Sequence, residues 1–126
     1  MKIYVVEDSD AIYDRIIRLL KEVEDSNVVG AADDELGAIR GIEDSTPDVV
    51  ISDINLLHGS GLNVLRHIKA VMPDVKVILL TNFHSDQYRA VAESYGADAF
   101  LDKSYDFLQI PQILRAWQPS LDSVPN

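Results

Sequence analysis

The chain contains no cysteine, which excludes a disulfide-stapled scaffold and any thiol chemistry. It also lacks a signal peptide and any apolar run near the roughly 18 residues needed to span a bilayer. We therefore expect a protein of the reducing cytoplasm. Basic residues are scarce, with 11 Lys and Arg against 21 Asp and Glu, so the net charge is −10. This balance argues against direct binding to nucleic acid or an anionic membrane, although an acidic surface can equally serve solubility.

Apolar runs and helical patterns alternate five times along the 126 residues, a length typical of one domain. The runs are continuous and rich in Val and Ile, as expected for parallel strands that are covered on both faces. They span Ile3–Val6, Asn27–Ala32, Asp48–Ser52, Val75–Leu80 and Ala99–Leu101. Such alternation requires right-handed crossovers, so the sequence predicts an α/β fold with an open, doubly wound parallel sheet.

Between these runs, apolar residues recur at helical spacing. The stripes are Ile12, Ile16, Leu19, Leu20 and Val23, then Leu62, Leu65, Ile68 and Met72, then Tyr88, Val91, Ala92 and Tyr95. Another helix is expected from about Asp34 to Asp44. It is the weakest of the predicted helices, because Gly37 and Gly41 each cost about 1 kcal/mol relative to Ala.

The ends of the last two helices carry their own signals. We expect Gly96 to end the fourth helix in the left-handed conformation, and Pro111 to open the main part of the fifth. The final segment QPSLDSVPN contains two Pro and little apolar content. The folded domain should therefore cover residues 1–118, with residues 119–126 forming a flexible tail or the start of a linker.

Three carboxylates follow two of the predicted strands. Glu7 and Asp8 follow the first strand, and Asp53 follows the third. Ligands of open parallel sheets bind beyond the carboxyl ends of the strands, and neighbouring strands lie about 4.8 Å apart. If these two strands are neighbours, the three carboxylates share one small cleft, where like charges raise one another's pKa or require a cation. An oxygen-only ligand set favours a hard divalent ion, and Mg²⁺ fits best.

Two further polar side chains end other strands: the hydroxyl of Thr81 ends the fourth, and the ammonium of Lys103 lies just past the fifth. A carboxylate beside Mg²⁺, with a hydroxyl and a Lys converging on it, indicates phosphoryl transfer to an aspartate. The cation and the Lys would neutralise phosphoryl oxygens while the carboxylate attacks in line. Each residue alone is a weak signal, since a lone Asp after a strand is usually a turn residue. Their order at successive strand ends makes the signal strong.

These motifs resemble the receiver domain of two-component response regulators, over residues 1 to about 117. The matching segments are VVED, VVISDINLLHGSG, VILLT and YGADAFLDKS. The resemblance implies a flavodoxin-like fold, as in chemotaxis regulators, with five parallel strands in the order 2-1-3-4-5 and helices on both faces. It also implies a phosphorylation-controlled signalling switch that receives its phosphoryl group from a histidine kinase or a phosphotransfer protein.

The resemblance implies a role for each matching residue at the acidic end of the sheet. Asp53 would be the phosphoacceptor, and Asp8 a direct Mg²⁺ ligand. Glu7 would act on the metal through water, and the backbone carbonyl of Asn55 would be the third protein ligand.

The resemblance also implies how the signal leaves the site. Thr81 and Lys103 would contact the phosphoryl group, and Phe100 would be the aromatic residue that swings inward. The surface of the fourth helix, fifth strand and fifth helix would then change for a downstream target. Because Phe has no hydroxyl to keep in water, exposing its ring costs on the order of 1–2 kcal/mol. We therefore predict that Phe100 lies largely inward even before phosphorylation.

Three positions depart from the pattern of the family. Leu57 and Ser104 stand where Pro is usual, and Asn82 stands where a very small residue is usual. Ser104 leaves the isomer of the preceding peptide bond open. Asn82, with Phe83 behind it, could narrow the route by which water or a phosphodonor reaches Asp53. None of these departures removes a reacting group, so we expect them to affect rates rather than chemistry.

Two other classes of protein share part of the pattern. A phosphatase of the haloacid dehalogenase kind also uses Asp, Thr or Ser, Lys and Mg²⁺. Such an enzyme needs a second Asp at the position where this chain has Asn55, and it needs a longer chain to form a substrate cap. A flavodoxin-like flavin binder needs Ser, Thr and Gly after the first strand, where EDSDAI would repel phosphate. We therefore interpret the chain as a switch that catalyses only its own phosphorylation and dephosphorylation. Whether it stands alone or belongs to a longer regulator is left open by the sequence.

Overall fold

The computed structural model describes residues 1–82 and 86–121. Its strands are β1 (Lys2–Val6), β2 (Asn27–Ala32), β3 (Val49–Asp53), β4 (Lys76–Thr81) and β5 (Ala99–Asp102). Its helices are α1 (Asp10–Leu20), α2 (Glu35–Ser45), α3 (Gly61–Val71), α4 (Asp86–Ser94) and α5 (Gln109–Leu121). Within these residues the strands form one parallel sheet in the order β2-β1-β3-β4-β5, which confirms the predicted fold. None of the described helices is long and apolar enough to cross a bilayer.

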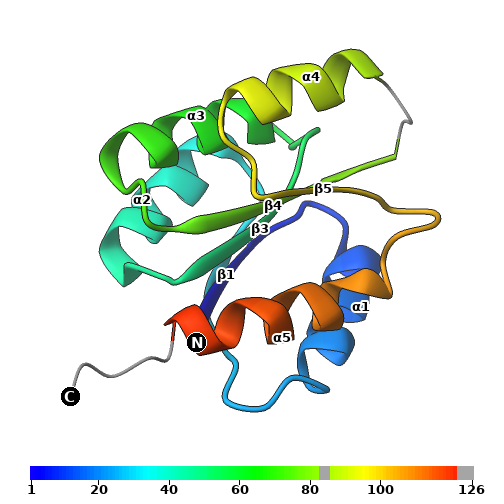
Figure 1. Ribbon diagram of the computed structural model, residues 1–126. Helices are drawn as coiled ribbons and strands as arrows, with labels where there is room; N and C mark the ends of the chain where they lie inside the picture. The colour runs from blue at the N-terminus through cyan, green and yellow to red at the C-terminus, as the bar shows by residue number, and fades with distance from the viewer. Residues whose placement is uncertain (83–85, 122–126) are drawn as a thin grey trace.

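Each face of the sheet has its own apolar core. Successive strand residues point to opposite faces, so in β1 Ile3 and Val5 pack toward α1 and α5, whereas Tyr4 and Val6 pack toward α2, α3 and α4. Figure 1 shows these two helical layers on either side of the sheet. β1, β3 and β4 are buried along almost their whole length, as their uninterrupted apolar runs predicted. The edge strand β2 differs from that expectation, because it is mostly exposed, with Val28 and Val29 38% and 37% exposed.

α1 is shorter than its apolar stripe suggested. The helix ends at Leu20, and Val23 lies in the turn that follows, although it is only 3% exposed and belongs to the core. The hydroxyl of Ser26 donates to the carbonyl oxygens of Leu20 and Val23, at 2.9 and 2.8 Å. These bonds satisfy carbonyls that a longer helix would have used, so the turn buries Val23 without continuing the helix.

α2 forms despite its two glycines. Asp34 is its N-cap, and the carboxylate accepts a hydrogen bond of 2.7 Å from the backbone N–H of Gly37. Gly41 faces the ring of Tyr4, and a Cβ at this position would lie 2.0 Å from the Tyr4 hydroxyl oxygen. The helix therefore loses about 1 kcal/mol of intrinsic propensity at Gly41 in exchange for room to bury an aromatic ring.

The C-terminus of α4 matches its prediction, whereas α5 begins before Pro111 and ends later than expected. Gly96 has a φ of 94°, and the following Ala97 N–H bonds back to the Ala92 carbonyl, as predicted for a left-handed cap. α5 begins at Gln109, so Pro111 lies within the first turn, where its missing N–H breaks no helical bond. α5 also runs to Leu121, three residues past the predicted domain boundary at 118, and residues 122–126 of the expected tail lie outside the described residues.

Candidate functional site

The carboxyl ends of four neighbouring strands bring the predicted polar residues to one edge of the sheet. Glu7 follows β1, Asp53 ends β3, Thr81 ends β4, and Lys103 follows β5. These strands are consecutive neighbours and all run in the same direction. Glu7, Asp53 and Lys103, which are separated by up to 96 positions in the sequence, therefore meet in one small volume.

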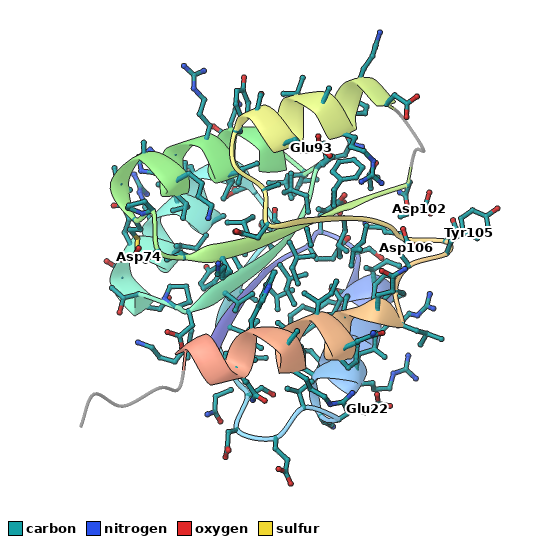
Figure 2. All side chains as sticks on the ribbon, viewed as in Figure 1. Glu22, Asp74, Glu93, Asp102, Tyr105 and Asp106 are labelled. Carbon is teal, nitrogen blue, oxygen red and sulfur yellow. The ribbon has the colours of Figure 1, made fainter. Side chains whose placement is uncertain are left out.

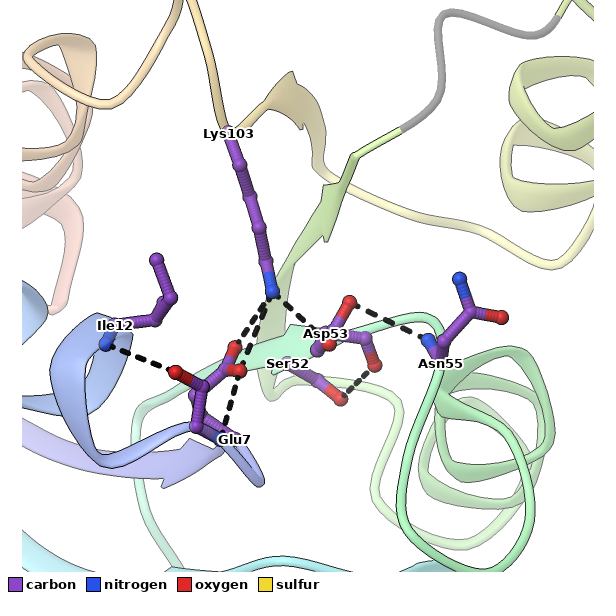
Figure 3. Close-up of polar contacts among 7 residues, drawn as sticks. Glu7, Ile12, Ser52, Asp53, Asn55 and Lys103 are labelled. Carbon is purple, nitrogen blue, oxygen red and sulfur yellow. Dashed lines mark hydrogen bonds and ion pairs between the residues drawn. The ribbon is translucent and has the colours of Figure 1, made fainter.

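Lys103 lies at the centre of this volume. Its ammonium nitrogen is 3.0 Å from Asp53 Oδ2, 3.0 Å from Glu7 Oε2 and 3.3 Å from Glu7 Oε1 (Figure 3). The three side chains are almost fully buried, with 5%, 5% and 0% of the Lys103, Asp53 and Glu7 side chains exposed. Coulomb attraction at this distance and burial is far stronger than in a surface salt bridge. One cation is therefore held between two buried carboxylates.

Burial governs the ionisation of both acids. Desolvation raises the pKa of Asp53 above its ordinary value, while the hydrogen bond and charge of Lys103 act to lower it. Desolvation likewise raises the pKa of Glu7, and the neighbouring Asp53 raises it further against the opposing effect of Lys103. The single ammonium therefore does not compensate for the burial of two carboxylates, and a second cation would favour their ionised forms.

The carboxylates satisfy the requirements of a hard metal ion. One oxygen from each of Glu7, Asp8 and Asp53 lies within 4.8 Å of the others, and Asp8 is exposed at the mouth of the cluster. Glu7 Oε2 is fully buried and accepts no hydrogen bond, although it lies beside the Lys103 ammonium. An oxygen-only donor set of this kind fits Mg²⁺ and its bound waters.

The segment after Asp53 presents backbone atoms to the same cluster. Asn55 N–H donates to Asp53 Oδ1 at 3.3 Å, and Asn55 pairs with Ser60 across an isolated antiparallel bridge. Gly61 N–H closes the segment by donating to the Ile54 carbonyl at 2.7 Å. A Cβ on Gly61 would lie 1.9 Å from the Asp53 carbonyl oxygen, so the first turn of α3 can approach β3 only because this residue is glycine.

The loop that carries Lys103 is fixed by two acidic side chains. Asp102 Oδ1 accepts from Ser104 N–H at 2.7 Å, and Asp106 Oδ2 accepts from Asp102 N–H at 2.9 Å. Figure 2 shows Asp102, Tyr105 and Asp106 on this loop, with the Tyr105 ring pointing outward. The Lys103–Ser104 peptide bond, whose isomer the sequence left open, is trans. Backbone hydrogen bonds to side chains therefore hold the base of the Lys103 side chain in place.

Thr81 and Phe100, the two residues expected to relay the signal, lie on the neighbouring strands β4 and β5. Thr81 is 1% exposed, and its carbonyl accepts from Lys103 N–H at 2.8 Å. Phe100 is half-buried against the α2–α3–α4 core, and the Arg89 guanidinium lies 4.8 Å from the centre of its ring. Its movement on phosphorylation stays a prediction. The cation over the ring was not predicted, because nothing in the local sequence relates Arg89 to Phe100.

The residues expected to narrow access to Asp53 are only partly described. Asn82 directly follows β4 and is exposed. Phe83, expected to stand behind it, lies outside the described residues. The pairing of Lys103 with Glu7 as well as Asp53 was also missed, because β3 and β4 lie between β1 and β5 and only the long Lys103 side chain spans that distance.

Comparisons with known proteins agree with this geometry. A family model described as the response regulator receiver domain matches residues 3–115. The chain is 29% identical over 115 residues to the response regulator GacA of Pseudomonas aeruginosa, an alignment covering 91% of this chain and 54% of GacA. It is 25% identical over 115 residues to the DNA-binding transcriptional activator DevR/DosR of Mycobacterium tuberculosis, covering 91% and 53%. The chain thus spans about half the length of these curated relatives.

Solved structures give the same result. The response regulator domain of Thermotoga maritima CheB superposes with a TM-score of 0.81 at 25% identity, covering 99% of this chain and 98% of that domain. A DNA-binding response regulator of the LuxR family from Staphylococcus aureus superposes with a TM-score of 0.84 at 27% identity, covering 91% and 96%. The haloacid dehalogenase alternative receives no support from these comparisons. The chain belongs to the response regulator receiver domain family and is a phosphorylation-controlled switch of two-component signalling.

Proposed function

We propose that Asp53 is the phosphoacceptor of this receiver domain. The observation that carries the proposal is the 3.0 Å contact between Lys103 Nζ and Asp53 Oδ2, at the centre of a cluster of three carboxylates. A buried carboxylate that is held by one cation, with donor oxygens for a second, suits nucleophilic attack on phosphorus. The phosphodonor would be a phosphohistidine of a kinase or phosphotransfer protein, or a small acyl phosphate.

Each neighbouring group would have a defined part in this transfer. An Asp53 oxygen attacks the phosphorus, and the bond from phosphorus to the donor breaks as the new bond forms. Lys103, already in contact with Asp53, would then pair with an oxygen of the bound phosphoryl group. Glu7 holds the other side of the ammonium and keeps it in the site during the transfer. The same residues would support hydrolysis of the acyl phosphate by water, and the domain would act on its own phosphoryl group only.

Mg²⁺ would be held by Asp8, Asp53 and the carbonyl of Asn55, with Glu7 acting through water. When bound, it supplies positive charge that neutralises phosphoryl oxygens as the donor bond breaks. Asp8 is the exposed member of the cluster and offers its carboxylate without rearrangement of the core. The ion would also favour the ionised form of Asp53, against the desolvation that raises its pKa.

The output would leave through α4, β5 and α5. Once Asp53 carries phosphate, the Thr81 hydroxyl would move toward it, and Phe100 would fill the space that Thr81 vacates. The net charge of −10 makes direct DNA binding by this domain unfavourable, so we expect the downstream target of this surface to be a protein surface.

Labelling with acetyl phosphate tests the proposal. Wild-type protein incubated with acetyl phosphate and Mg²⁺ should gain one phosphoryl group in its intact mass, and hydroxylamine should remove it, as expected for an acyl phosphate. Asp53→Asn should gain none. Asp10→Asn removes the same charge from the first turn of α1, outside the cluster, and should be labelled like wild type. Single labelling that persists in Asp53→Asn would reject Asp53 as the phosphoacceptor.

A further inference from the structure

The loop between Asp53 and α3, residues 54–60, contains a proposed metal ligand that is a backbone atom. In the proposed site Asn55 contributes its backbone carbonyl, so its position depends on how the surrounding main chain is held. The bonds within the loop join Asn55 to Asp53 and Ser60 and leave the outer part of the loop to be fixed from elsewhere. Partners that orient a ligand from behind commonly set metal affinity.

That outer part is fastened to the start of α2. Glu35 Oε1 accepts from Ser60 N–H at 3.0 Å and from Asn63 Nδ2 at 2.9 Å. The backbone N–H of Glu35 donates to the His58 carbonyl at 2.9 Å. One residue therefore makes three hydrogen bonds to a segment that lies at least 23 positions further along the chain.

Two neighbouring features fit the same attachment. Leu57 N–H donates to the Asp33 carbonyl at 3.2 Å, a bond that a Pro at this position would lack. Gly59 has a φ of 99°, and a Cβ there would lie 2.5 Å from the Glu35 Cβ, so only glycine lets Glu35 pass over the loop.

We propose that Glu35 is a positioning residue of the phosphorylation site. Its carboxylate holds the loop 54–60 against α2, so that the Asn55 carbonyl faces the metal-binding carboxylates. The inference rests on the proposed function, in which the Asn55 carbonyl is a Mg²⁺ ligand. It requires the acceptor oxygens of Glu35 and not its charge, so Gln should serve in its place and Ala should not.

Three variants test the assignment. Glu35→Ala removes the acceptor, and Glu35→Gln keeps it without the charge. Glu43→Ala removes the same side chain from the same helix, where Glu43 joins α2 to α3 through His67 Nε2 at 2.6 Å and lies outside the cluster. Mg²⁺ affinity is measured by calorimetry on each purified protein, and exchange of the Gly61 amide hydrogen is measured without metal. Labelling by acetyl phosphate is then followed as a function of Mg²⁺ concentration.

Glu35→Ala should weaken Mg²⁺ binding by about ten-fold, the low end for residues that orient a metal ligand. It should also speed exchange at Gly61, and its labelling rate should recover at saturating Mg²⁺. Glu35→Gln and Glu43→Ala should bind Mg²⁺ like wild type. The proposal is overturned if Glu35→Ala binds Mg²⁺ as tightly as wild type. It is also overturned if Glu35→Gln weakens Mg²⁺ binding as much as Glu35→Ala, because the charge and not the acceptor oxygens would then set the affinity. If wild type binds Mg²⁺ but takes no label, the proposed function fails while the Mg²⁺ measurements still decide the role of Glu35.

Discussion

Crowding of carboxylates without metal should make Asp8→Asn more stable than wild type. The ligand oxygens of Glu7, Asp8 and Asp53 lie within 4.8 Å of one another. Unit charges at about that separation repel by about 0.9 kcal/mol in water and about 3.5 kcal/mol at an effective dielectric constant of 20. Asp8 is exposed, so the lower value applies. Asp8 is repelled by Glu7 and by Asp53 and attracted by Lys103 to a comparable extent. The net destabilisation that Asp8 causes without metal is therefore about 1 kcal/mol, equivalent to about 3–5 °C in melting temperature.

Thermal unfolding with and without Mg²⁺ measures both consequences of the substitution. In EDTA, Asp8→Asn should melt above wild type, and the difference should shrink as salt screens the charges. Mg²⁺ at about ten times its Kd should then stabilise wild type by about 1.4 kcal/mol and leave the variant almost unchanged.

Asp10→Asn is the matched control for this experiment. Asp10 lies in the first turn of α1, where its charge interacts favourably with the helix dipole. Its removal should lower the metal-free melting temperature slightly and keep the full response to Mg²⁺. The reasoning is refuted if Mg²⁺ shifts Asp8→Asn as much as wild type, because the metal would then bind elsewhere. A metal-free Asp8→Asn protein that melts below wild type would show that repulsion does not dominate at this cluster.

Three further predictions concern the same end of the sheet. Lys103→Met should lower the free energy of unfolding by about 3 kcal/mol in urea at neutral pH, since it leaves two buried carboxylates without their cation, and Mg²⁺ should restore part of the loss. Because burial raises the pKa of Glu7 and of Asp53 above 4.5 and 3.8, the unfolded chain releases these protons first. Metal-free stability should therefore fall as pH rises above those values, and a fall equally steep in Asp53→Asn would contradict the assignment. Gly61→Ala should lower the free energy of unfolding in urea by about 3 kcal/mol and slow labelling by acetyl phosphate, because its Cβ would lie 1.9 Å from the Asp53 carbonyl oxygen.

The sequence by itself determined the strands and which polar residues follow them. A parallel strand covered on both faces needs a continuous run of apolar residues, and such runs in Val49–Asp53 and Lys76–Thr81 were readable to within a residue. Parallel strands also end at one edge of the sheet, so polar residues that follow nearby strands gather at that edge. Asp53 and Lys103 could therefore be placed together from the pattern of residues alone.

Only the tertiary structure decided which groups actually touch. Gly41 counts against a helix by propensity, yet α2 keeps it because the Tyr4 ring of β1 packs against that position. Glu35 makes its bonds to a segment that begins 23 residues later, and no periodicity or motif relates the two. Contacts of this kind depend on how helices and loops pack over the sheet. Packing is set by side-chain volume and hydrogen-bond geometry between distant segments, which a linear pattern of residue types does not contain.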